Sequence, residues 1–269
     1  MRNRLLLDPN DKFSQNAWDD VSLSPEALHK AQQKIKNDEA HLPTTPPTIT
    51  YEPWHHFYTN HQTAFFKERH WILSEFPMLN TTNQRIFEVG CGTGSTLSQI
   101  PTTNHLFGID CAAAAINIIQ NRPNFIPTHF TTHNATLPQP FPQLYTNMDF
   151  VLLIFTLSAI HPDHHQTVLH HINRSLKPQG TLLFRDYAEM DLTQLRFKPH
   201  QILAPNLYQR GEGTYAYFFT LNYLQTLAQA TNFTITHIQE DRRLLINRKK
   251  QLEMPRHWIQ LQLTKNNPT

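Results

Sequence analysis

From Arg85 onward, strand-like and helix-like patterns of apolar residues alternate along the chain. The predicted strands lie near 85–89, 105–110, 124–130, 149–155 and 180–186, and the predicted helices near 95–100, 112–121 and 163–176. The helix near 163–176 has a defined end, because Lys177-Pro178-Gln179-Gly180 combines a proline with a glycine. This alternation predicts a parallel sheet with helices on both faces.

The C-terminal part follows a different pattern. One helix near 221–231 leads into two consecutive strand candidates, 234–246 and 257–264. Because no helix separates the two strands, we expect them to pair as an antiparallel hairpin at the edge of the sheet.

Residues 1–83 differ in composition from the rest of the chain. Ser24 and Pro25 are typical of a helix start, and a proline-rich joint follows at 43–47. The apolar residues of the next stretch fit a helix packed on the main domain: Phe65, Phe66, Ile72, Leu73 and Phe76. The sequence therefore predicts an N-terminal extension over 1–83 and a main domain over 84–269.

Length and charge limit the possible functions. The 269 residues can form one large domain with an extension, and the net charge of +2 demands no nucleic-acid partner, so any basic surface is local. The 17 histidines are scattered, and pairs such as His164-His165 lack the cysteines or carboxylates of a zinc site. No metal is expected.

The two cysteines, Cys91 and Cys111, each follow a predicted strand and are expected to be reduced thiols. No apolar run approaches the roughly 20 residues that cross a bilayer. The first residues resemble neither a signal nor a transit peptide. We therefore expect a soluble cytoplasmic protein without membrane contact.

Three of the seven glycines, Gly90, Gly92 and Gly94, lie in one short turn between the strand at 85–89 and Ser95. A strand, a glycine turn and a helix start form a cradle for a nucleotide-like ligand. The spacing is G-x-G-x-G rather than the G-x-G-x-x-G of dinucleotide sites, and no phosphate-binding loop with Lys-Ser/Thr occurs. With Glu88 before the first glycine, the turn resembles motif I of class I S-adenosylmethionine (SAM)-dependent methyltransferases. The alternative is an ordinary turn without a ligand.

Asp110 closes the second predicted strand at the distance expected for a ribose-binding acid. It could also cap the following helix, and the two roles are compatible. After the third strand such methyltransferases usually carry an acid near the adenine amine, whereas this chain has Asn134-Ala135. Asn134 keeps an acceptor oxygen but loses the charge.

Further segments resemble the tRNA 3-methylcytidine methyltransferase family, in order and spacing, over nearly the whole chain. They are Phe65 to Trp71, Leu153 to Asp163, Leu183 to Tyr187, Leu195 to Lys198, Arg210 to Thr214 and Tyr217 to Thr220. Asn16-Ala17-Trp18-Asp19 is similar to the branch that acts on threonine and, in some cases, arginine tRNAs. The resemblance implies methyl transfer from SAM to N3 of the cytidine at position 32 in the anticodon loop.

The resemblance also implies a fold: an α/β, Rossmann-like class I methyltransferase with a mostly parallel seven-stranded sheet, a C-terminal antiparallel hairpin and a mainly helical N-terminal extension. The extension would bind RNA and cover the cofactor. With the acid and second glycine of motif I, the expected cofactor residues are Trp54, Tyr58, Glu88, Gly90, Gly92, Asp110, Asn134, Ala135 and Ile154. Asn134 and Ala135 depart from the family's Asp-Leu.

Cytidine N3 carries a lone pair, so it can attack the methyl group without a general base. The product is a cation, and Asp186, at the end of the fifth strand, is our candidate for the carboxylate that assists. The alternative is that Arg185 and Asp186 form a structural ion pair. The candidates for stacking on the base are Phe155, Tyr187, Tyr217 and Phe218, and for each the alternative is a core position.

Cationic side chains suit the RNA backbone. The candidates are Lys67, Arg69, His70, Arg196, Lys198 and Arg210, and for each the alternative is a solvated surface position. Arg185, beside Asp186, is a further candidate for contact with the substrate. The expected partner is the tRNA anticodon arm, with a helper protein such as an aminoacyl-tRNA synthetase left open. Two other functions also stay open: a class I methyltransferase for a protein or small molecule, and a weakly active SAM-fold protein that binds tRNA.

Overall fold

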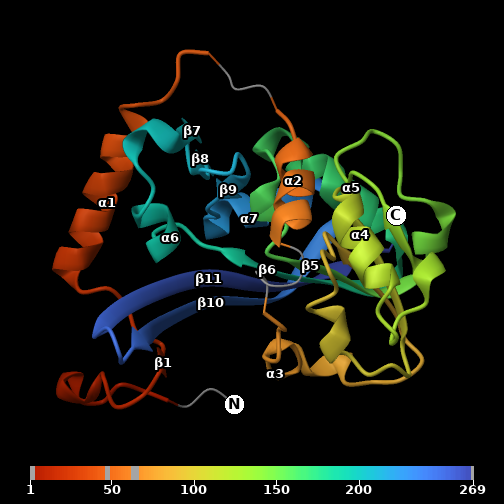
Figure 1. Cartoon of the computed structure of the whole chain (residues 1–269), viewed down its shortest axis with the longest axis horizontal. Coiled ribbons are helices and arrows are strands. Elements are labelled where there is room, and N and C mark those ends of the chain that lie inside the picture. Colours follow the sequence, from red (N-terminus) through yellow and green to blue (C-terminus); the bar gives the residue numbers. More distant parts are fainter. Residues whose placement is uncertain (1–3, 46–48, 62–66, 268–269) are drawn as a thin grey trace.

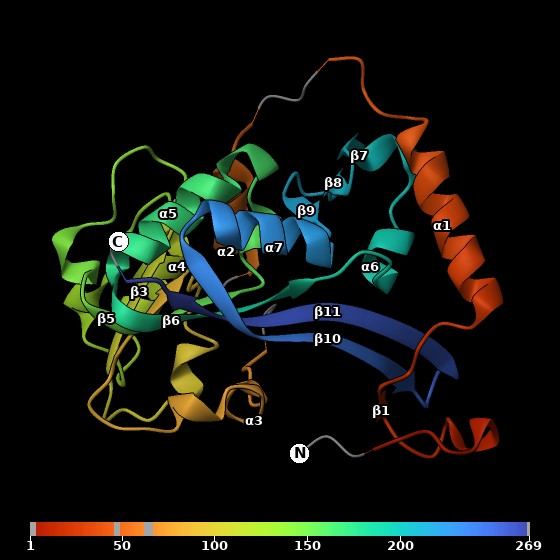
Figure 2. The same ribbon diagram turned by 180° about the vertical axis from the view of Figure 1, so that it is seen from behind.

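The centre of the molecule is one eight-stranded sheet, seen from the front in Figure 1 and from behind in Figure 2. The computed structural model describes residues 4–45, 49–61 and 67–267. In sheet order the strands are β1 (Ala17–Asp19), β10 (Phe233–Asn247), β11 (Leu252–Lys265), β6 (Leu176–Tyr187), β5 (Met148–Ile154), β2 (Arg85–Val89), β3 (His105–Asp110) and β4 (Phe130–Thr132). The five strands from β6 to β4 are parallel, whereas β11, β10 and β1 pair antiparallel.

Helices cover both faces of this sheet, as the alternation of strands and helices predicts. Alternate residues of β5 belong to different core clusters, since Val151 and Leu153 pack in one and Leu152 and Ile154 in the other. The helices of the first cluster are α5 (His165–Ser175) and α7 (Leu221–Ala230). Those of the second are α3 (Ile72–Glu75) and α4 (Ala113–Gln120).

The N-terminal extension is part of the fold rather than an appendage. Strand β1 pairs with β10, and Trp18 packs against Leu244 and Ile246. Helix α1 (Pro25–Glu39) begins as predicted, because the Ser24 hydroxyl accepts a hydrogen bond from the amide of Ala27 at 3.2 Å. Helix α2 (Glu52–His61) packs on α4. A domain boundary at 83/84 stays a prediction.

A small second sheet lies beside α1 and was not predicted. It consists of β7 (Ile202–Ala204), β8 (Leu207–Gln209) and β9 (Tyr215–Tyr217), and the short helix α6 (Leu192–Leu195) precedes it. The buried carboxylate of Asp38 on α1 accepts a hydrogen bond from the Tyr208 hydroxyl at 2.9 Å. In both views the β10–β11 hairpin extends beneath α1 toward β1.

Two predicted elements are shorter than expected. The helix near 95–100 is only a 3-10 turn, Leu97–Gln99, because Pro101 favours an extended conformation for Ile100. The strand near 124–130 begins only at Phe130, after a 3-10 turn that starts at Pro127.

Three further expectations differ from the structure in part. The sheet has β1 in addition to the seven expected strands, and β1 covers β10 at residues 243–245, so the hairpin does not form the edge there. Phe65 and Phe66 of the predicted helix lie outside the described residues, whereas Ile72 and Phe76 are fully buried.

Over the described ranges no helix could span a membrane.

Candidate active site

The glycine turn follows β2 at the carboxyl edge of the sheet. Gly90, Gly92 and Gly94 have φ of +72°, +51° and +85°, which is the left-handed region that glycine adopts without strain. A Cβ on Gly90 would stand 2.3 Å from Cγ2 of Thr156. The amides of Gly90 and Cys91 both donate to the carbonyl of Ile109, at 2.8 and 3.0 Å, and tie the turn to the end of β3.

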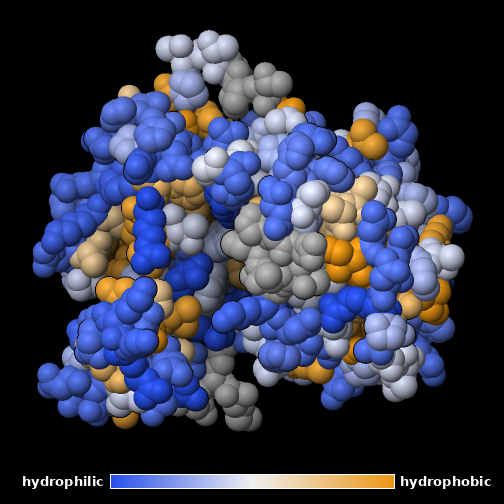
Figure 3. Space-filling view, viewed as in Figure 1, coloured by the Kyte–Doolittle hydropathy of each residue, from blue (hydrophilic) through white to orange (hydrophobic). Residues whose placement is uncertain are grey.

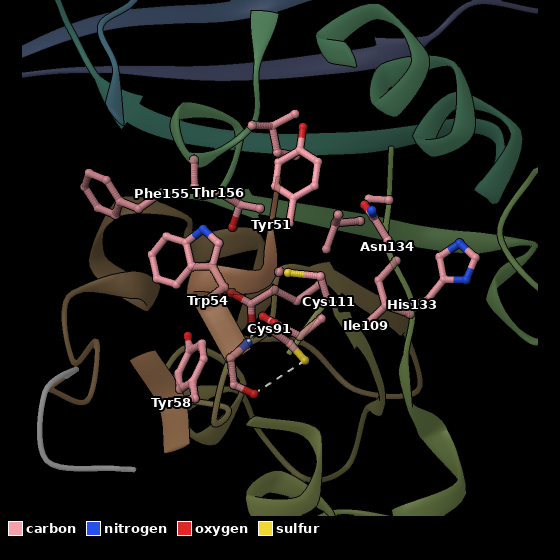
Figure 4. Close-up of a pocket in the computed structure, with 18 of the residues that line it drawn as sticks. Tyr51, Trp54, Tyr58, Cys91, Ile109, Cys111, His133, Asn134, Phe155 and Thr156 are labelled. Atoms are coloured by element: carbon pink, nitrogen blue, oxygen red, sulfur yellow. Dashed lines mark hydrogen bonds between the residues drawn. The ribbon is translucent and has the colours of Figure 1, made fainter. Parts of the chain in front are cut away.

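A cavity opens along this turn and continues across the ends of the neighbouring strands (Figure 4). All the predicted cofactor residues except Ile154 line it. Ile154 is fully buried, and its carbonyl accepts hydrogen bonds from two cavity residues, Arg69 at 3.0 Å and the Thr156 hydroxyl at 3.3 Å. In the view of Figure 4, Phe155 and Asn134 lie at opposite ends, with Trp54 and Cys111 between them.

Asp110 joins the glycine turn to helix α4. Its Oδ2 accepts from the amide of Gly92 and its Oδ1 from the amide of Ala112, both at 2.9 Å. Burial raises the pKa of this carboxyl, and the two amide hydrogen bonds oppose that rise. Asp110 does not cap α4, because the N-cap residue is Ala112 and Asp110 accepts from the amide of Ala112 itself; the ribose contact stays a prediction.

Glu88 and Arg69 form a second polar pair in the wall of the cavity. Nη1 of Arg69 lies 3.7 Å from Oε1 of Glu88 and donates to the hydroxyl of Thr96 at 2.9 Å. Oε2 of Glu88 is buried without a hydrogen-bond partner among the described residues. Burial raises the pKa of Glu88 to about 7, although the charge of Arg69 acts in the opposite direction. Arg69, expected at the RNA surface, is therefore a cavity residue.

Helix α2 supplies the wall that lies against the glycine turn at Gly92. Trp54 and Tyr58 share one face of α2, with ring centroids 6.2 Å apart. Tyr51 lines the cavity too and was not predicted. Positions 51, 54 and 58 have helical spacing, so that pattern could have revealed it. Burial raises the pKa of Tyr51 to about 12.

The Phe155 end of the cavity adjoins a cluster of aromatic rings. Phe155 has φ of +53°, a strained value for a side chain of this size. Its ring centroid lies 5.2 Å from that of Tyr187 and 6.3 Å from those of Trp71 and Trp258. This arrangement offers π-faces beside the glycine turn.

The comparisons with known proteins agree with this geometry. Residues 60–238 match the family model described as a methyltransferase domain. A zebrafish protein named tRNA N(3)-cytidine methyltransferase METTL2 is 34% identical over 97% of this chain and 88% of its own length. The chain belongs to the tRNA N(3)-cytidine methyltransferase family.

Two fungal relatives have similar names. The fission yeast tRNA N(3)-methylcytidine methyltransferase trm140 is 34% identical over 97% of this chain and 91% of its own length. The budding yeast tRNA(Thr) (cytosine(32)-N(3))-methyltransferase is 35% identical over 96% of this chain, which spans only 44% of that protein.

Solved structures share the fold. A SAM-dependent methyltransferase from Anabaena variabilis has a TM-score of 0.61 at 12% identity, over 82% of this chain and 98% of its own. The Burkholderia thailandensis 1,6-didemethyltoxoflavin-N1-methyltransferase, solved with S-adenosylhomocysteine, has a TM-score of 0.51 at 16% identity, over 92% of this chain and 93% of its own. S-adenosylmethionine is the cofactor of this methyltransferase. Among the described residues no cluster of His, Cys, Asp and Glu could hold a metal ion.

Arg185 lies in the core of this family member rather than on its surface. Arg185 is only 3% exposed. Its guanidinium forms an ion pair with Asp241 and donates to Oε1 of Gln260 at 2.8 Å. The rings of Trp71 and Trp258 lie 5.0 and 4.9 Å from it. The alternative ion pair with Asp186 is therefore wrong, because Arg185 pairs with Asp241.

Asp186 is fully buried and does not line the cavity. Its Oδ2 accepts from the amide of Ser158 and its Oδ1 from the amide of Tyr187, both at 2.9 Å. Burial raises its pKa to about 6. The carboxylate thus holds the turn after β5 against the end of β6, and its role in catalysis stays a prediction.

The remaining RNA candidates differ in exposure. Lys67, Arg196 and Lys198 are exposed. His70 Nδ1 lies 2.6 Å from Oε1 of Gln99, and Arg210 donates to the carbonyl of Tyr215 at 2.5 Å. His70 is exposed as well and Arg210 is only partly exposed, so their protein partners, rather than exposure alone, separate these two from the other three.

Proposed function

We propose that this protein transfers a methyl group from SAM to N3 of a cytidine in tRNA, at position 32 of the anticodon loop. The near full-length similarity to the zebrafish relative carries the proposal. The position of the cytidine rests on the printed name of the budding yeast relative and on the family resemblance.

The cavity fits the cofactor. Gly90 and Gly92 both line it, so the backbone of the glycine turn is open to a ligand on that side. The unpartnered Oε2 of Glu88 suits the ammonium of the amino-acid end, and Arg69 beside it suits the carboxylate. Asp110 would accept from the ribose hydroxyls. Trp54 and Tyr58 would cover the ligand.

The reaction needs alignment more than proton transfer. SAM supplies an electrophilic methyl group on a sulfonium. The N3 lone pair forms the new N–C bond, the S–C electrons stay on sulfur, and the positive charge moves to the base. The protein therefore has to hold the base in line and tolerate a cation. Phe155 and Tyr187 can flank a base that has left its loop, and such stacking is worth roughly 1–3 kcal/mol.

Asp186 supports this arrangement in one of two ways. It assists the cationic base directly, or it positions Ser158 and Tyr187 through its two hydrogen bonds. Because it does not line the cavity, the positioning role requires no movement of the protein.

A concave face of the molecule suits an RNA arm. Figure 3 shows a hollow between the lobe that carries α1 and the lobe at the end of the β10–β11 hairpin, with hydrophilic side chains on both lobes. A pocket between the two is lined by Leu28, Arg256 and His257, among others. The exposed Lys67, Arg196 and Lys198 would contact phosphates.

Transfer of a labelled methyl group to a tRNA pool, followed by nucleoside analysis, tests the proposal. We expect 3-methylcytidine as the product. Label in another nucleoside, or in a protein or small molecule only, would contradict it. A reaction that needs added aminoacyl-tRNA synthetase would identify the helper protein that the resemblance leaves open.

A further inference from the structure

Asn134 stands at the part of the cavity that receives the base of the cofactor. The glycine turn follows β2, Asp110 ends β3, and residues 133–136 follow β4 on the other side of β3. A nucleoside whose ribose meets Asp110, with its amino-acid end at the glycine turn, therefore extends its base toward β4. Of the residues after β4, His133, Asn134, Ala135 and Thr136 line the cavity.

The side-chain oxygen of Asn134 is already fully used. Oδ1 accepts from the backbone amide of Thr136 at 3.0 Å and from the Thr136 hydroxyl at 2.8 Å. A backbone N–H can only donate, so the atom that it meets must be the amide oxygen rather than the nitrogen. Two donors occupy the two lone pairs of this oxygen.

The amide nitrogen of Asn134 is left to face the ligand. Over the described parts of the chain, Nδ2 has no hydrogen-bond partner. Asn134 is partly exposed and lines the cavity, so its two N–H donors are available there. The local turn at Thr136 thus makes this position a donor.

We propose that the side-chain amide of Asn134 donates a hydrogen bond to an acceptor on the edge of the purine, so that this site tolerates a 6-oxo group where SAM has a 6-amino group. The inference rests on the cofactor assignment and not on the identity of the RNA substrate. The 6-amino group is a donor and gains nothing from a second donor, whereas N1 of adenine and the 6-carbonyl of hypoxanthine, whose own N1 carries a proton, both accept. A carboxylate at this position would do the opposite, because it would accept from the amino group and repel a carbonyl oxygen.

The experiment compares S-adenosylhomocysteine with S-inosylhomocysteine, its deaminated analogue, by calorimetric binding to the full chain without RNA. We expect the wild type to bind the two within about fivefold. Asn134→Asp should prefer the adenosyl ligand by about tenfold or more, the value of one charge-assisted hydrogen bond. Asn117→Asp is the matched control, since it changes an exposed asparagine on α4 to the same acid and should keep the wild-type ratio.

A second variant covers the case in which Asn134→Asp does not fold. Thr136→Val removes one donor from Oδ1 and leaves the backbone bond, so preference for the adenosyl ligand should increase. A wild type that prefers the adenosyl ligand by tenfold or more overturns the inference, as does an unchanged ratio in a folded Asn134→Asp or Thr136→Val protein. A wild type that binds neither ligand overturns the cofactor site and the inference with it. A wild type that binds both ligands but makes no 3-methylcytidine overturns only the proposed RNA reaction.

Discussion

The hydroxyl of Tyr58 occupies the space beside Gly92 that a side chain would need. A Cβ on Gly92 would stand 2.5 Å from the Tyr58 hydroxyl oxygen and 3.4 Å from the ring carbon that bears it. Helix α2 of the N-terminal extension is therefore seated directly on the glycine turn. Residues from both sides of the proposed domain boundary, such as Tyr58 and Gly92, therefore line the cofactor cavity together.

Gly92→Ala should lose both stability and affinity for S-adenosylhomocysteine. The left-handed φ of +51° costs an L-residue roughly 1–2 kcal/mol, and the clash with Tyr58 adds about 1–3 kcal/mol. In Tyr58→Phe/Gly92→Ala the atom nearest to the new Cβ is at ordinary contact distance. The double variant should therefore regain the stability lost to the clash but not the stability lost to the left-handed φ. Urea unfolding and calorimetric binding measure both effects.

Gly211→Ala is the control for this cycle, because a Cβ there meets nothing within 4 Å. Its unfolding free energy should stay within about 0.5 kcal/mol of the wild type. If the effects of Tyr58→Phe and Gly92→Ala on the free energy of unfolding simply add in the double variant, the clash between the Tyr58 hydroxyl and a Cβ at position 92 is contradicted.

Binding of S-adenosylhomocysteine should strengthen as the pH rises toward neutrality. Free Glu88 has a pKa raised to about 7 by burial, so it is mostly protonated below that pH. A ligand ammonium favours the ionised form, and binding then releases a proton. Affinity should rise by up to about tenfold per pH unit between about pH 5 and 7, and Glu88→Gln should flatten the profile. Calorimetry at several pH values measures both.

The ligand itself provides the control for the pH profile. 5′-Methylthioadenosine lacks the amino-acid end, so its affinity should not follow Glu88. The raised pKa also makes the protein without ligand lose stability as pH increases from about 4.5 through 7. Equal slopes for the two ligands would show that Glu88 does not meet the ammonium.

The sequence predicted the parts of the site that are encoded locally. The glycine spacing, Glu88 and Asp110 all lie within or beside short strands, and each lines the cavity as expected. Arg69 was assigned to the RNA surface, and Arg185 to the substrate, because a single sequence reveals their charge but not their burial. Arg185 is buried against Asp241 on β10, a partner that only the antiparallel hairpin brings near.

The same reason explains the missed strand and sheet. Strand β1 has three residues, and its pairing of Ala17 with Leu245 depends on the whole sheet being formed. Strands β7, β8 and β9 are equally short, so neither periodicity nor propensity distinguishes them from loops.

Asp241→Asn should destabilise the protein by about 3–5 kcal/mol, because the buried Asp241 pairs with both Arg185 and Arg243 and its loss leaves Arg185, among the described residues, with only the longer pair to Glu75, at 3.8 Å. The side chains of Arg185 and Asp241 are 4% and 3% exposed, so water cannot replace the lost ion pair. Urea unfolding measures the change. Glu26→Gln is the control, because Glu26 and Lys30 are 79% and 71% exposed and their pair should contribute within about 0.5 kcal/mol. Similar losses in both variants would contradict the view that burial sets the value of the Arg185 pair.

Arg196→Ala and Lys198→Ala should weaken tRNA binding and reduce its salt dependence. Both side chains are exposed, and neither takes part in an ion pair among the described residues, so their charges are free to neutralise phosphates. Each phosphate contact that is lost should reduce the slope of log K against log salt by about 1. Filter binding of tRNA at several salt concentrations measures the slope. Arg174→Ala, which removes an exposed cation from α5, should leave the slope unchanged. A slope that is the same in all three variants as in the wild type would place the phosphate contacts elsewhere on the molecule.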